Sequence, residues 1–289
     1  MKLFSVRKGL KKRRTQLQVD EVDEQLRNRL WNVFKSIFWD VIYRQDPYVF
    51  RELIEKLWDN YFKRPTDTIP TNDVDCYNEI RNYFFECEWY EVYKFLEFIV
   101  ENSLHLRPGV IVNSPVPIPS WGEAFKNKCN IILEEELSAY RFVGNLITQI
   151  TTKEEISEIE EALENPLKNV RQHIETALKL LSDKKNPDYR NSIKESISAV
   201  EAMCKLIAKS ESVTLGEALN IIKNKGNVEI HPALLDAFNK LYGYTSSADG
   251  IRHALTNEKV KVGFEEAKFM LVMCSAFTNY LKYKAKNLL

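Results

Sequence analysis

Hydrophobic positions recur at helical spacing through most of the chain. Apolar residues return every three or four positions between Val22 and Tyr43, and similar patterns run through Tyr48–Phe62 and Asp73–Asn102. Such spacing places apolar side chains on one face of a helix. The segment 63–73, KRPTDTIPTND, interrupts the pattern, because proline lacks a backbone donor and favours turns. The first hundred residues are therefore predicted to be mainly helical.

This N-terminal region is crowded with aromatic residues. Nineteen lie between Trp31 and Phe98, many of them in the run YFFECEWYEVYKFLEF at 83–98. Each ring buries a large apolar area, so the pattern favours an aromatic helical core. The other interpretation, a platform on which nucleic-acid bases stack, would need exposed rings interleaved with cations.

The middle of the chain changes character. Residues 107–120, RPGVIVNSPVPIPS, hold four of the ten prolines and predict a loop before a helix at Trp121–Leu137. Two short β-prone runs then flank Gly144–Asn145, a pair that tolerates positive φ, and they predict a small hairpin within 139–150. Three segments follow from this division: a basic arm at 1–21, an N-terminal helical domain at 22–152 and a C-terminal bundle at 153–289.

The C-terminal segment is predicted to be a compact set of helices. Thr152 and Glu155 form a capping-box signature that opens a helix reaching about Leu181. A second long helix starts after Pro187, and the short connection implies an antiparallel pair. The apolar stripe of this second helix consists of Ile193, Ile197, Val200, Cys204 and Ile207.

Shorter helices follow in this bundle. One is expected at 214–224, capped by Thr214, and one at 232–242. Ser246 and Asp249 form a variant capping box, which predicts a further helix from about Ser247. The last helix, Phe264–Lys284, is apolar almost all round, so its own domain or a second copy of the chain is expected to bury it.

The composition narrows the class of protein. The 289 residues are 44% hydrophobic, enough for a large core in two domains. Forty-one basic residues balance forty-one acidic ones, so any attraction to a polyanion must be local. One local patch is RKGLKKRR at 7–14, which lacks the apolar stretch of a secretory signal.

The cysteine pattern and the hydropathy argue against disulfide-linked, zinc-binding and membrane-spanning proteins. Five scattered cysteines without a Cys-x-x-Cys pair argue against a disulfide framework or a zinc site and favour a reducing cytoplasm. The longest apolar run, at 269–277, is about half the ~20 residues that cross a bilayer. Neither a P-loop nor a Gly-x-Gly-x-x-Gly is present. We therefore expect no membrane span, no metal and no cofactor.

The sharpest candidate for chemistry is the stretch SADGIRHALTN at 247–257. Arg252 stands beside His253, one of only four histidines. In a helix of ~100° per residue, both would share a polar face with Asp249, Thr256 and Asn257. Asp249 precedes Arg252 by three residues and His253 by four, the spacings at which helical side chains touch.

These residue types suit the cleavage of RNA. A guanidinium fork holds two phosphate oxygens and offsets the charge that develops in the transition state. An imidazole with a pKa near ~6.5 moves a proton at neutral pH, and RNA supplies the 2′-hydroxyl as nucleophile, so no metal is required. Spacing alone favours the other interpretation, a solvated capping face with an ordinary salt bridge.

Longer phrases carry a family resemblance. PDYRNSIKESISAVEAMCKLI at 187–207 and LYGYTSSADGIRHAL at 241–255 resemble the HEPN domains attached to AbiJ-type N-terminal regions in bacterial abortive-infection proteins. Five phrases from the first half of the chain resemble the AbiJ-type N-terminal region: KLFSVRKGLK, LWNVF, YFKRPTDTIP, YFFECEWYEVYKFLEFI and LEEELSAYRFV. The likeness spans nearly the whole chain.

The resemblance implies a mainly α protein with an AbiJ-type N-terminal helical domain and a C-terminal HEPN-like bundle. It further implies a dimer, whose polar motifs line a cleft that cuts RNA without a metal in defence against phage. The motif falls on Arg252 and His253. The family pattern, however, separates its arginine and histidine by four to six residues in all, and Asn257 stands there in this chain.

Two arrangements fit this departure. In the one we prefer, His253 is the general base from its adjacent position; in the other, Asn257 takes the place of the histidine and only binds substrate, as Thr256 also would. The preceding long helix offers further substrate-binding candidates along one edge of its apolar stripe: Arg190, Lys194, Glu201 and the neighbouring Lys205. These charged residues are equally consistent with an edge that is simply solvated. The remaining histidines are interpreted as structural: His105, His173 and His231.

Two functions are predicted from these observations. The first is a metal-independent endoribonuclease, a toxin-like effector of anti-phage defence that binds RNA, dimerises through its C-terminal domain and answers to an unidentified regulatory partner. The alternative is a degenerate HEPN module that binds RNA or a protein without cleavage. The basic arm suits either, because cations contact phosphate backbones without sequence preference, and it is also consistent with a solvated tail.

Overall fold

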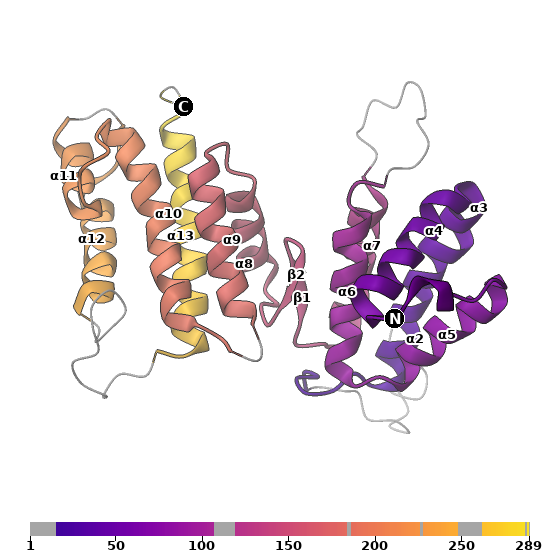
Figure 1. Ribbon diagram of the computed structural model, residues 1–289. Helices are drawn as coiled ribbons and strands as arrows, with labels where there is room; N and C mark the ends of the chain where they lie inside the picture. The colour runs from indigo at the N-terminus through magenta and orange to yellow at the C-terminus, as the bar shows by residue number, and fades with distance from the viewer. Residues whose placement is uncertain are drawn as a thin grey trace. The chain divides into compact units, whose positions relative to one another are not determined.

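The computed structural model describes residues 16–106, 119–183, 186–225, 228–247, 262–286 and 288. The chain divides between Gln149 and Ile150 into two compact units. Helices dominate both, and the described strands form one two-stranded sheet (Figure 1). The mainly α fold with a small hairpin is confirmed. The predictions for the basic arm at 7–14, for most of the loop at 107–120 and for the motif residues beyond Ser247 lie outside the described residues.

The first unit is built from helices and the hairpin. Its elements in chain order are α2 (Glu24–Phe34), η1 (Lys35–Ile42), α3 (Tyr43–Gln45), α4 (Pro47–Lys56), η2 (Leu57–Phe62), η3 (Thr66–Thr68), α5 (Asp73–Glu86), α6 (Trp89–Ser103), α7 (Trp121–Glu135), β1 (Arg141–Val143) and β2 (Leu146–Thr148). Both η1 and η2 are π-helical, a wider coil in which residues five apart come together. Lys35 and Asp40 accordingly form an ion pair at 2.7 Å.

Aromatic rings form the core of the first unit. Phe95 packs edge-on against Phe34 and Phe84, with centroids 5.2 and 5.4 Å apart, and all three side chains are buried. Edge-to-face packing of this kind stabilises the fold beyond the free energy gained by burying the apolar area of the rings. Among the described aromatic residues, Tyr48 is the most exposed, at 89%. The predicted aromatic core is confirmed, and it leaves too few open rings for a stacking platform.

The predicted pattern at Asp73–Asn102 is two helices rather than one. Helix α5 ends at Glu86, Cys87 adopts an extended conformation, and α6 begins at Trp89. Arg27 of α2 stabilises this break, because its guanidinium donates to the carbonyl oxygens of Phe84 and Cys87 at 2.6 and 2.9 Å. Carbonyl oxygens at the end of a helix have no donor within the helix, so the guanidinium supplies one.

The hairpin is confirmed. β1 and β2 pair antiparallel, with Phe142 opposite Ile147, and Gly144 in the turn has a φ of 57°. Asn130 of α7 holds β1 in place, since its side chain bonds both the N–H and the carbonyl of Phe142, at 2.8 and 3.0 Å.

The ordered part of this unit begins earlier than residue 22. Gln18 is fully buried and exchanges backbone hydrogen bonds with Leu137 and Ala139. Its amide also donates to the carbonyl of Glu136 at 2.7 Å. The final residues of the segment predicted as an arm are therefore tied to the domain.

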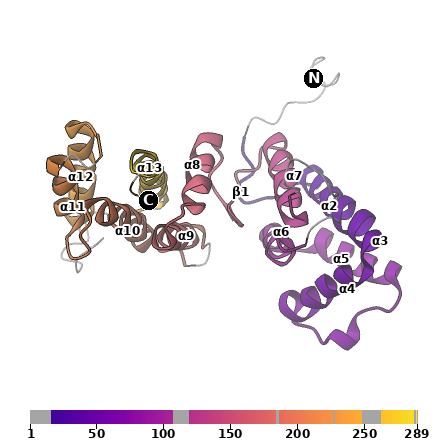
Figure 2. The same cartoon turned by 90° about the horizontal axis from the view of Figure 1, so that it is seen from above.

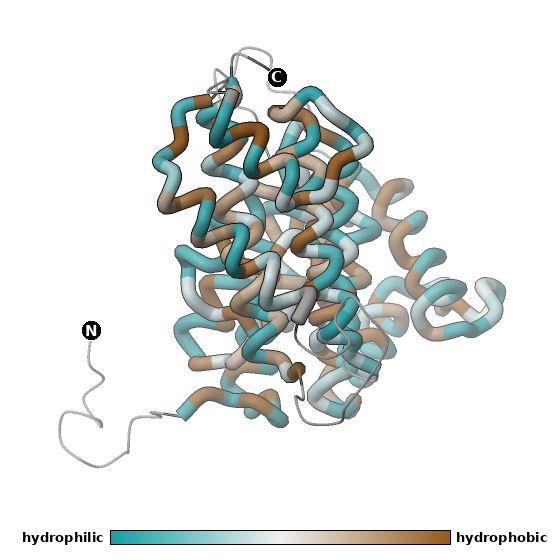
Figure 3. Tube along the Cα trace, turned by 90° about the vertical axis from the view of Figure 1, so that its left-hand side faces the viewer, coloured by the Kyte–Doolittle hydropathy of each residue, from teal (hydrophilic) through white to brown (hydrophobic). Residues whose placement is uncertain are grey.

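The second unit is a bundle of helices. Its elements are α8 (Lys153–Leu163), α9 (Lys168–Ser182), α10 (Tyr189–Ala208), α11 (Leu215–Lys225), α12 (Pro232–Ser247) and α13 (Phe264–Lys284). Viewed close to the helix axes, α13 lies over α9 and α10 beside α8, while α11 and α12 pack at the outer edge of α10 (Figure 2). Hydrophobic and hydrophilic positions alternate along the helices, as expected for helices with one buried face (Figure 3).

The helix predicted from Glu154 to Leu181 is wrong in one respect, because it is two helices. Helix α8 ends at Leu163 and α9 starts at Lys168. Pro166 lies between them, and proline disfavours the helical conformation at the residue before it. Asn165 is buried there, and its side-chain oxygen accepts from the N–H of Leu167 at 3.0 Å.

Two capping predictions are also corrected. Thr152 precedes α8 as predicted, but its side chain makes no capping hydrogen bond, and Glu155 pairs with Lys268 at 3.0 Å instead. Helix α12 continues to Ser247 rather than ending near residue 242, so Ser246 lies within α12 instead of directly before a new helix. Thr245 is fully buried and donates to the carbonyl of Tyr242, which stabilises this last turn.

Several further helix predictions for the bundle are confirmed. α9 and α10 are antiparallel, with Ser192 donating to the carbonyl of Ala177 at 2.8 Å. The stripe Ile193, Ile197, Val200, Cys204 and Ile207 is buried throughout. Thr214 and Glu217 form the reciprocal bonds of a capping box at the start of α11, and α13 has the predicted bounds.

Candidate functional site

The segment that carries the Arg-His pair is anchored at both ends to the same part of the second unit. It leaves α12 after Ser247 and enters α13 at Phe264. Phe264 packs edge-on against Tyr189 at the start of α10, with ring centroids 6.2 Å apart. On the other side, Tyr244 of α12 lies near Glu266 of α13: burial and the Glu266 carboxylate together raise the pKa of Tyr244.

The start of α13 is fixed by its own sequence. Glu266 accepts a hydrogen bond from the backbone N–H of Gly263 at 2.9 Å, which satisfies a donor at the helix start. The start of α10 is fixed similarly, because Asp188 accepts from the N–H of Asn191 at 3.0 Å. The starts of α10 and α13 and the end of α12 thus lie at the same end of the bundle.

Two of the substrate-binding candidates belong to this end of the bundle. Arg190 is in the first turn of α10, directly after Tyr189, and Lys194 follows one turn later on the same face. Arg190 is half-buried, whereas Lys194 is exposed. Arg190 directly follows Tyr189, whose ring contacts Phe264 at the start of α13. Asp249, Arg252, His253, Thr256 and Asn257 lie outside the described residues.

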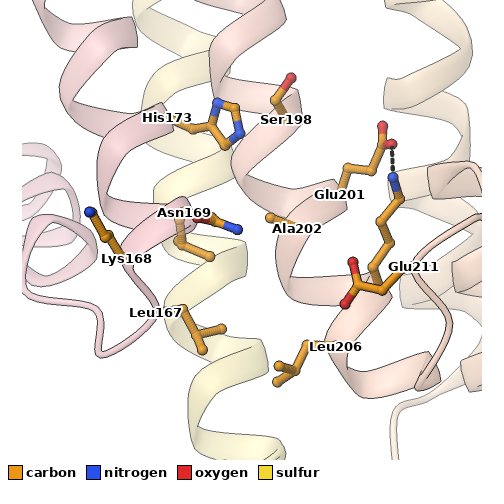
Figure 4. Close-up of a pocket in the computed structure, with 11 residues that line it drawn as sticks. Leu167, Lys168, Asn169, His173, Ser198, Glu201, Ala202, Leu206 and Glu211 are labelled. Carbon is orange, nitrogen blue, oxygen red and sulfur yellow. Dashed lines mark ion pairs between the residues drawn. The ribbon is translucent and has the colours of Figure 1, made fainter.

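Glu201, the third candidate on α10, lies elsewhere. It is eleven residues beyond Arg190, which is roughly 16 Å along the helix axis. There it lines a cavity of about 470 Å³ between the start of α9 and the second half of α10 (Figure 4). Arg190 and Lys194 do not line this cavity. The shared helical face of the three residues does not bring them to one place.

Charged and polar side chains surround the cavity. Glu201 forms an ion pair with Lys205 at 2.9 Å, and Glu211 lies beyond them (Figure 4). From α9, Lys168 and His173 complete the wall. A cavity of this size is within the range of small-ligand sites.

His173 is a cavity residue that the sequence analysis assigned to structure alone. Its Nδ1 lies 2.7 Å from Glu195 of α10, so the imidazole also links the two helices. The available signal was Pro166: a helix restarting after that proline places Lys168 and His173 in the first turns of α9. His231 is structural as predicted, since its Nδ1 accepts from the N–H of Ala233 at the start of α12.

Among residues 16–106, 119–183, 186–225, 228–247 and 262–286, no three His, Cys, Asp or Glu side chains gather as a metal site would require. No helix in this part of the chain combines the length and the apolar character needed to cross a bilayer.

Comparison with known families decides the identity of the first unit. The profile of AbiJ N-terminal domain 4 matches residues 2–165, more than half of the chain. The chain belongs to the AbiJ N-terminal domain 4 family. No curated protein and no solved structure matches the chain.

The AbiJ match extends past the first unit. It includes the aromatic helices, the hairpin and helix α8, and it ends at Asn165, immediately before the proline that separates α8 from α9. The bundle from α9 to α13, which carries the cavity and the Arg-His segment, lies beyond the AbiJ match.

Proposed function

We propose that the chain is an effector of bacterial abortive infection, in which the C-terminal bundle is a HEPN-like endoribonuclease. Membership of the AbiJ N-terminal domain 4 family is the observation that carries the proposal. The resemblance of 187–207 and 241–255 to HEPN domains supplies the activity. The position of Arg190 beside the entry to α13 supports a phosphate-binding surface at that end of the bundle.

The reaction requires only groups from the chain and from RNA. The 2′-hydroxyl oxygen attacks the adjacent phosphorus, His253 accepts the hydroxyl proton, and the bond to the 5′-oxygen breaks. The 5′-oxygen leaves with a proton returned by an acid, and the product ends are a 2′,3′-cyclic phosphate and a 5′-hydroxyl. Arg252 binds the phosphate oxygens, where its charge offsets that of the transition state.

Asp249 orients the guanidinium and the imidazole, and Asn257 and Thr256 bind the substrate. Arg190 and Lys194 contact neighbouring phosphates. Glu201 is less suited to contact the same RNA phosphates, because it is a carboxylate paired with Lys205 and lies about three turns of helix away from Arg190. No metal and no cofactor takes part.

The test is cleavage of total cellular RNA and of tRNA by the purified full chain, with and without EDTA. We expect cleavage that survives the chelator and products that end in cyclic phosphate. Arg252→Ala and His253→Ala should each abolish cleavage and cellular toxicity. His105→Ala is the matched control, because His105 is an exposed histidine of the first unit. Folded variants of Arg252 and His253 with full activity would refute the assignment.

A second function has one observation in its favour. Asn257 stands where the HEPN pattern has its histidine, and an amide binds phosphate or base edges but does not move protons at neutral pH. In that case the bundle binds RNA or a partner protein without cutting it. Retention of labelled RNA by the pure protein, with no cleavage and with binding lost in Asn257→Ala, identifies this alternative.

A further inference from the structure

The cavity between α9 and α10 has polar groups on two sides that the fold itself does not use. Asn169 points from the first turn of α9 toward α10, and the Glu211 carboxylate points back toward α9 from just beyond the end of α10 (Figure 4). Neither side chain forms a hydrogen bond or an ion pair within the described part of the chain. An amide and a carboxylate that face one space in this way are available to a ligand.

Apolar side chains lie between these two groups. Leu167 and Leu206 point toward one another from the two helices, and Ala202 lies on α10 between Asn169 and Glu211 (Figure 4). All three apolar side chains are partly exposed, so the cavity offers apolar surface to a ligand. Apolar surface with a few polar groups that fix orientation is the usual lining of a small-ligand site.

The charges around the cavity favour a neutral ligand. Two lysines and two glutamates line it, and Glu201 is paired with Lys205 at 2.9 Å. The Lys168 ammonium group points away from α10 (Figure 4). The two carboxylates oppose the entry of a phosphate, and the Lys205 ammonium group opposes the entry of a cation. A neutral molecule that presents N–H donors to Glu211 meets neither obstacle.

We propose that this cavity binds a guanine base. Guanine presents N1–H and N2–H side by side, and a carboxylate accepts such a pair through its two oxygens. Glu211 accepts this pair, and the amide nitrogen of Asn169 donates to N7 at the other side of the ring system. Leu167, Ala202 and Leu206 supply apolar surface to the ring. Enzymes that bind unstacked bases combine the same two kinds of contact.

The Glu211 carboxylate selects guanine over adenine. Adenine has a lone pair at N1 where guanine has N1–H, so N1 of adenine would face a carboxylate oxygen. A site that depends on hydrogen bonds rejects a ligand that leaves them unmade. Inosine retains N1–H but lacks the N2 amine, and it therefore keeps one of the two bonds to Glu211.

Isothermal titration calorimetry of the full chain with guanosine, inosine and adenosine tests this selectivity. Guanosine should bind, inosine should bind at least about tenfold more weakly because one hydrogen bond to a charged group is lost, and adenosine should show no measurable binding. Glu211→Gln should weaken guanosine binding at least about tenfold, since an amide has only one acceptor oxygen. Glu175→Gln, at an exposed position of α9, is the matched control and should bind guanosine as the wild type does.

A modified base tests the role of Asn169. In 7-deazaguanosine a C–H group replaces N7, so this nucleoside should bind the wild type about 2–10-fold more weakly than guanosine does. The two nucleosides should bind Asn169→Ala equally, because the donor to N7 is then absent. Circular dichroism establishes that the variants are folded, as expected for exposed side chains.

Free guanine nucleotides and RNA both supply a guanine base. A 2′-O-methyl oligouridylate with one central guanine distinguishes these sources from one another. If RNA is the source, this oligonucleotide binds more tightly than guanosine and GMP do, and replacing its guanine with adenine weakens its binding. If the free nucleotide is the source, guanosine and GMP bind, and the exchange of guanine for adenine in the oligonucleotide has no effect.

The inference does not rest on the proposed nuclease, because binding is measured and the 2′-O-methyl backbone has no nucleophile. Failure of RNA cleavage therefore leaves it standing. Equal affinity for guanosine and adenosine overturns it, as does guanosine binding that Glu211→Gln leaves unchanged. Absence of binding by both guanosine and the guanine-containing oligonucleotide overturns it equally. Binding of free arginine in place of guanosine would show that the Glu211 carboxylate recognises a guanidinium group instead.

Discussion

Tyr189 at the start of α10 and Phe264 at the start of α13 hold their rings edge-to-face, with centroids 6.2 Å apart and planes at 75°. The two residues are 75 positions apart in sequence, and each is partly exposed. The contact joins the first turn of α10 to the first turn of α13. It therefore places the start of α13 against the residue that precedes Arg190, the cation that we propose contacts phosphate.

The Tyr189–Phe264 contact predicts an energetic coupling. Aromatic pairs in this geometry contribute about 0.5–1.5 kcal/mol beyond area burial. In urea unfolding, Tyr189→Ala, Phe264→Ala and the double variant should therefore give free energies that are non-additive by about that amount. If the bundle cleaves RNA, both single variants should also lose cleavage, because the segment loses one of its anchors.

The Trp39–Phe50 pair of the first unit is the control. Its rings meet at 4.9 Å and 88°, so alanine variants should show a similar coupling. Cleavage should be retained in these variants, since they leave the bundle intact. Strictly additive free energies for Tyr189 and Phe264 would show that the contact does not stabilise the fold.

The sequence alone predicted those helices and strands that are determined by residues close together in the chain. The bounds of α13 follow from an apolar pattern 21 residues long, and the hairpin from the Gly144–Asn145 turn. The break between α8 and α9 was missed, although Pro166 marks it in the sequence. Cys87 gave no such signal: the break there depends on Arg27, which is 60 residues away in sequence. The capping role of Thr152 failed for a similar reason, because Glu155 pairs with Lys268.

The placement of the α10 candidates was predictable along that helix but not against its neighbours. The ~100° rotation and the rise per residue put Arg190, Lys194 and Glu201 on one face, with Glu201 roughly 16 Å along the axis from Arg190. They did not show that Glu201 lies against the start of α9. The cavity at Glu201 exists because α9 restarts after Pro166 and runs antiparallel to α10. That arrangement is tertiary, and no periodicity within α10 contains it.

The aromatic core of the AbiJ domain predicts a large loss of stability on truncation. Phe95 is fully buried and packs against Phe34 and Phe84. Phe95→Ala should lower the free energy of unfolding by about 3–5 kcal/mol, because the lost ring leaves a cavity that the helices cannot close. Tyr48→Ala, at an 89% exposed position, should change it little. Equal effects of the two changes in urea unfolding would contradict the assigned core.

The cysteines should be poorly reactive in the folded chain. Burial raises the pKa of Cys76 to about 11 and of Cys274 to about 12, and it also raises the pKa of Cys129 and of Cys204. Because the thiolate is the reactive form, a disulfide reagent at neutral pH should modify these four slowly. Cys87 is only partly buried and should react first, and Cys87→Ser should remove that phase. Rapid modification of all five cysteines before unfolding would contradict this burial.

The ion pair between Lys282 of α13 and Glu161 of α8 predicts a pH-dependent contribution to stability. Their charged atoms lie 2.6 Å apart, and the hydrogen bond from Lys282 lowers the pKa of Glu161 below its ordinary value of about 4.5, against the opposing effect of burial. A carboxyl group with a lowered pKa in the folded state stabilises the fold above its ordinary pKa. That stabilisation is lost as the pH falls through the lowered value.

Glu161→Gln should therefore reduce the free energy of unfolding at neutral pH, by about 0.2–1 kcal/mol because both side chains are partly solvated. The difference from wild type should disappear in urea titrations in strong acid. Glu175→Gln, an exposed position of α9, should show no such dependence, and a difference for Glu161→Gln that persists in strong acid would mean that packing rather than charge links α8 to α13.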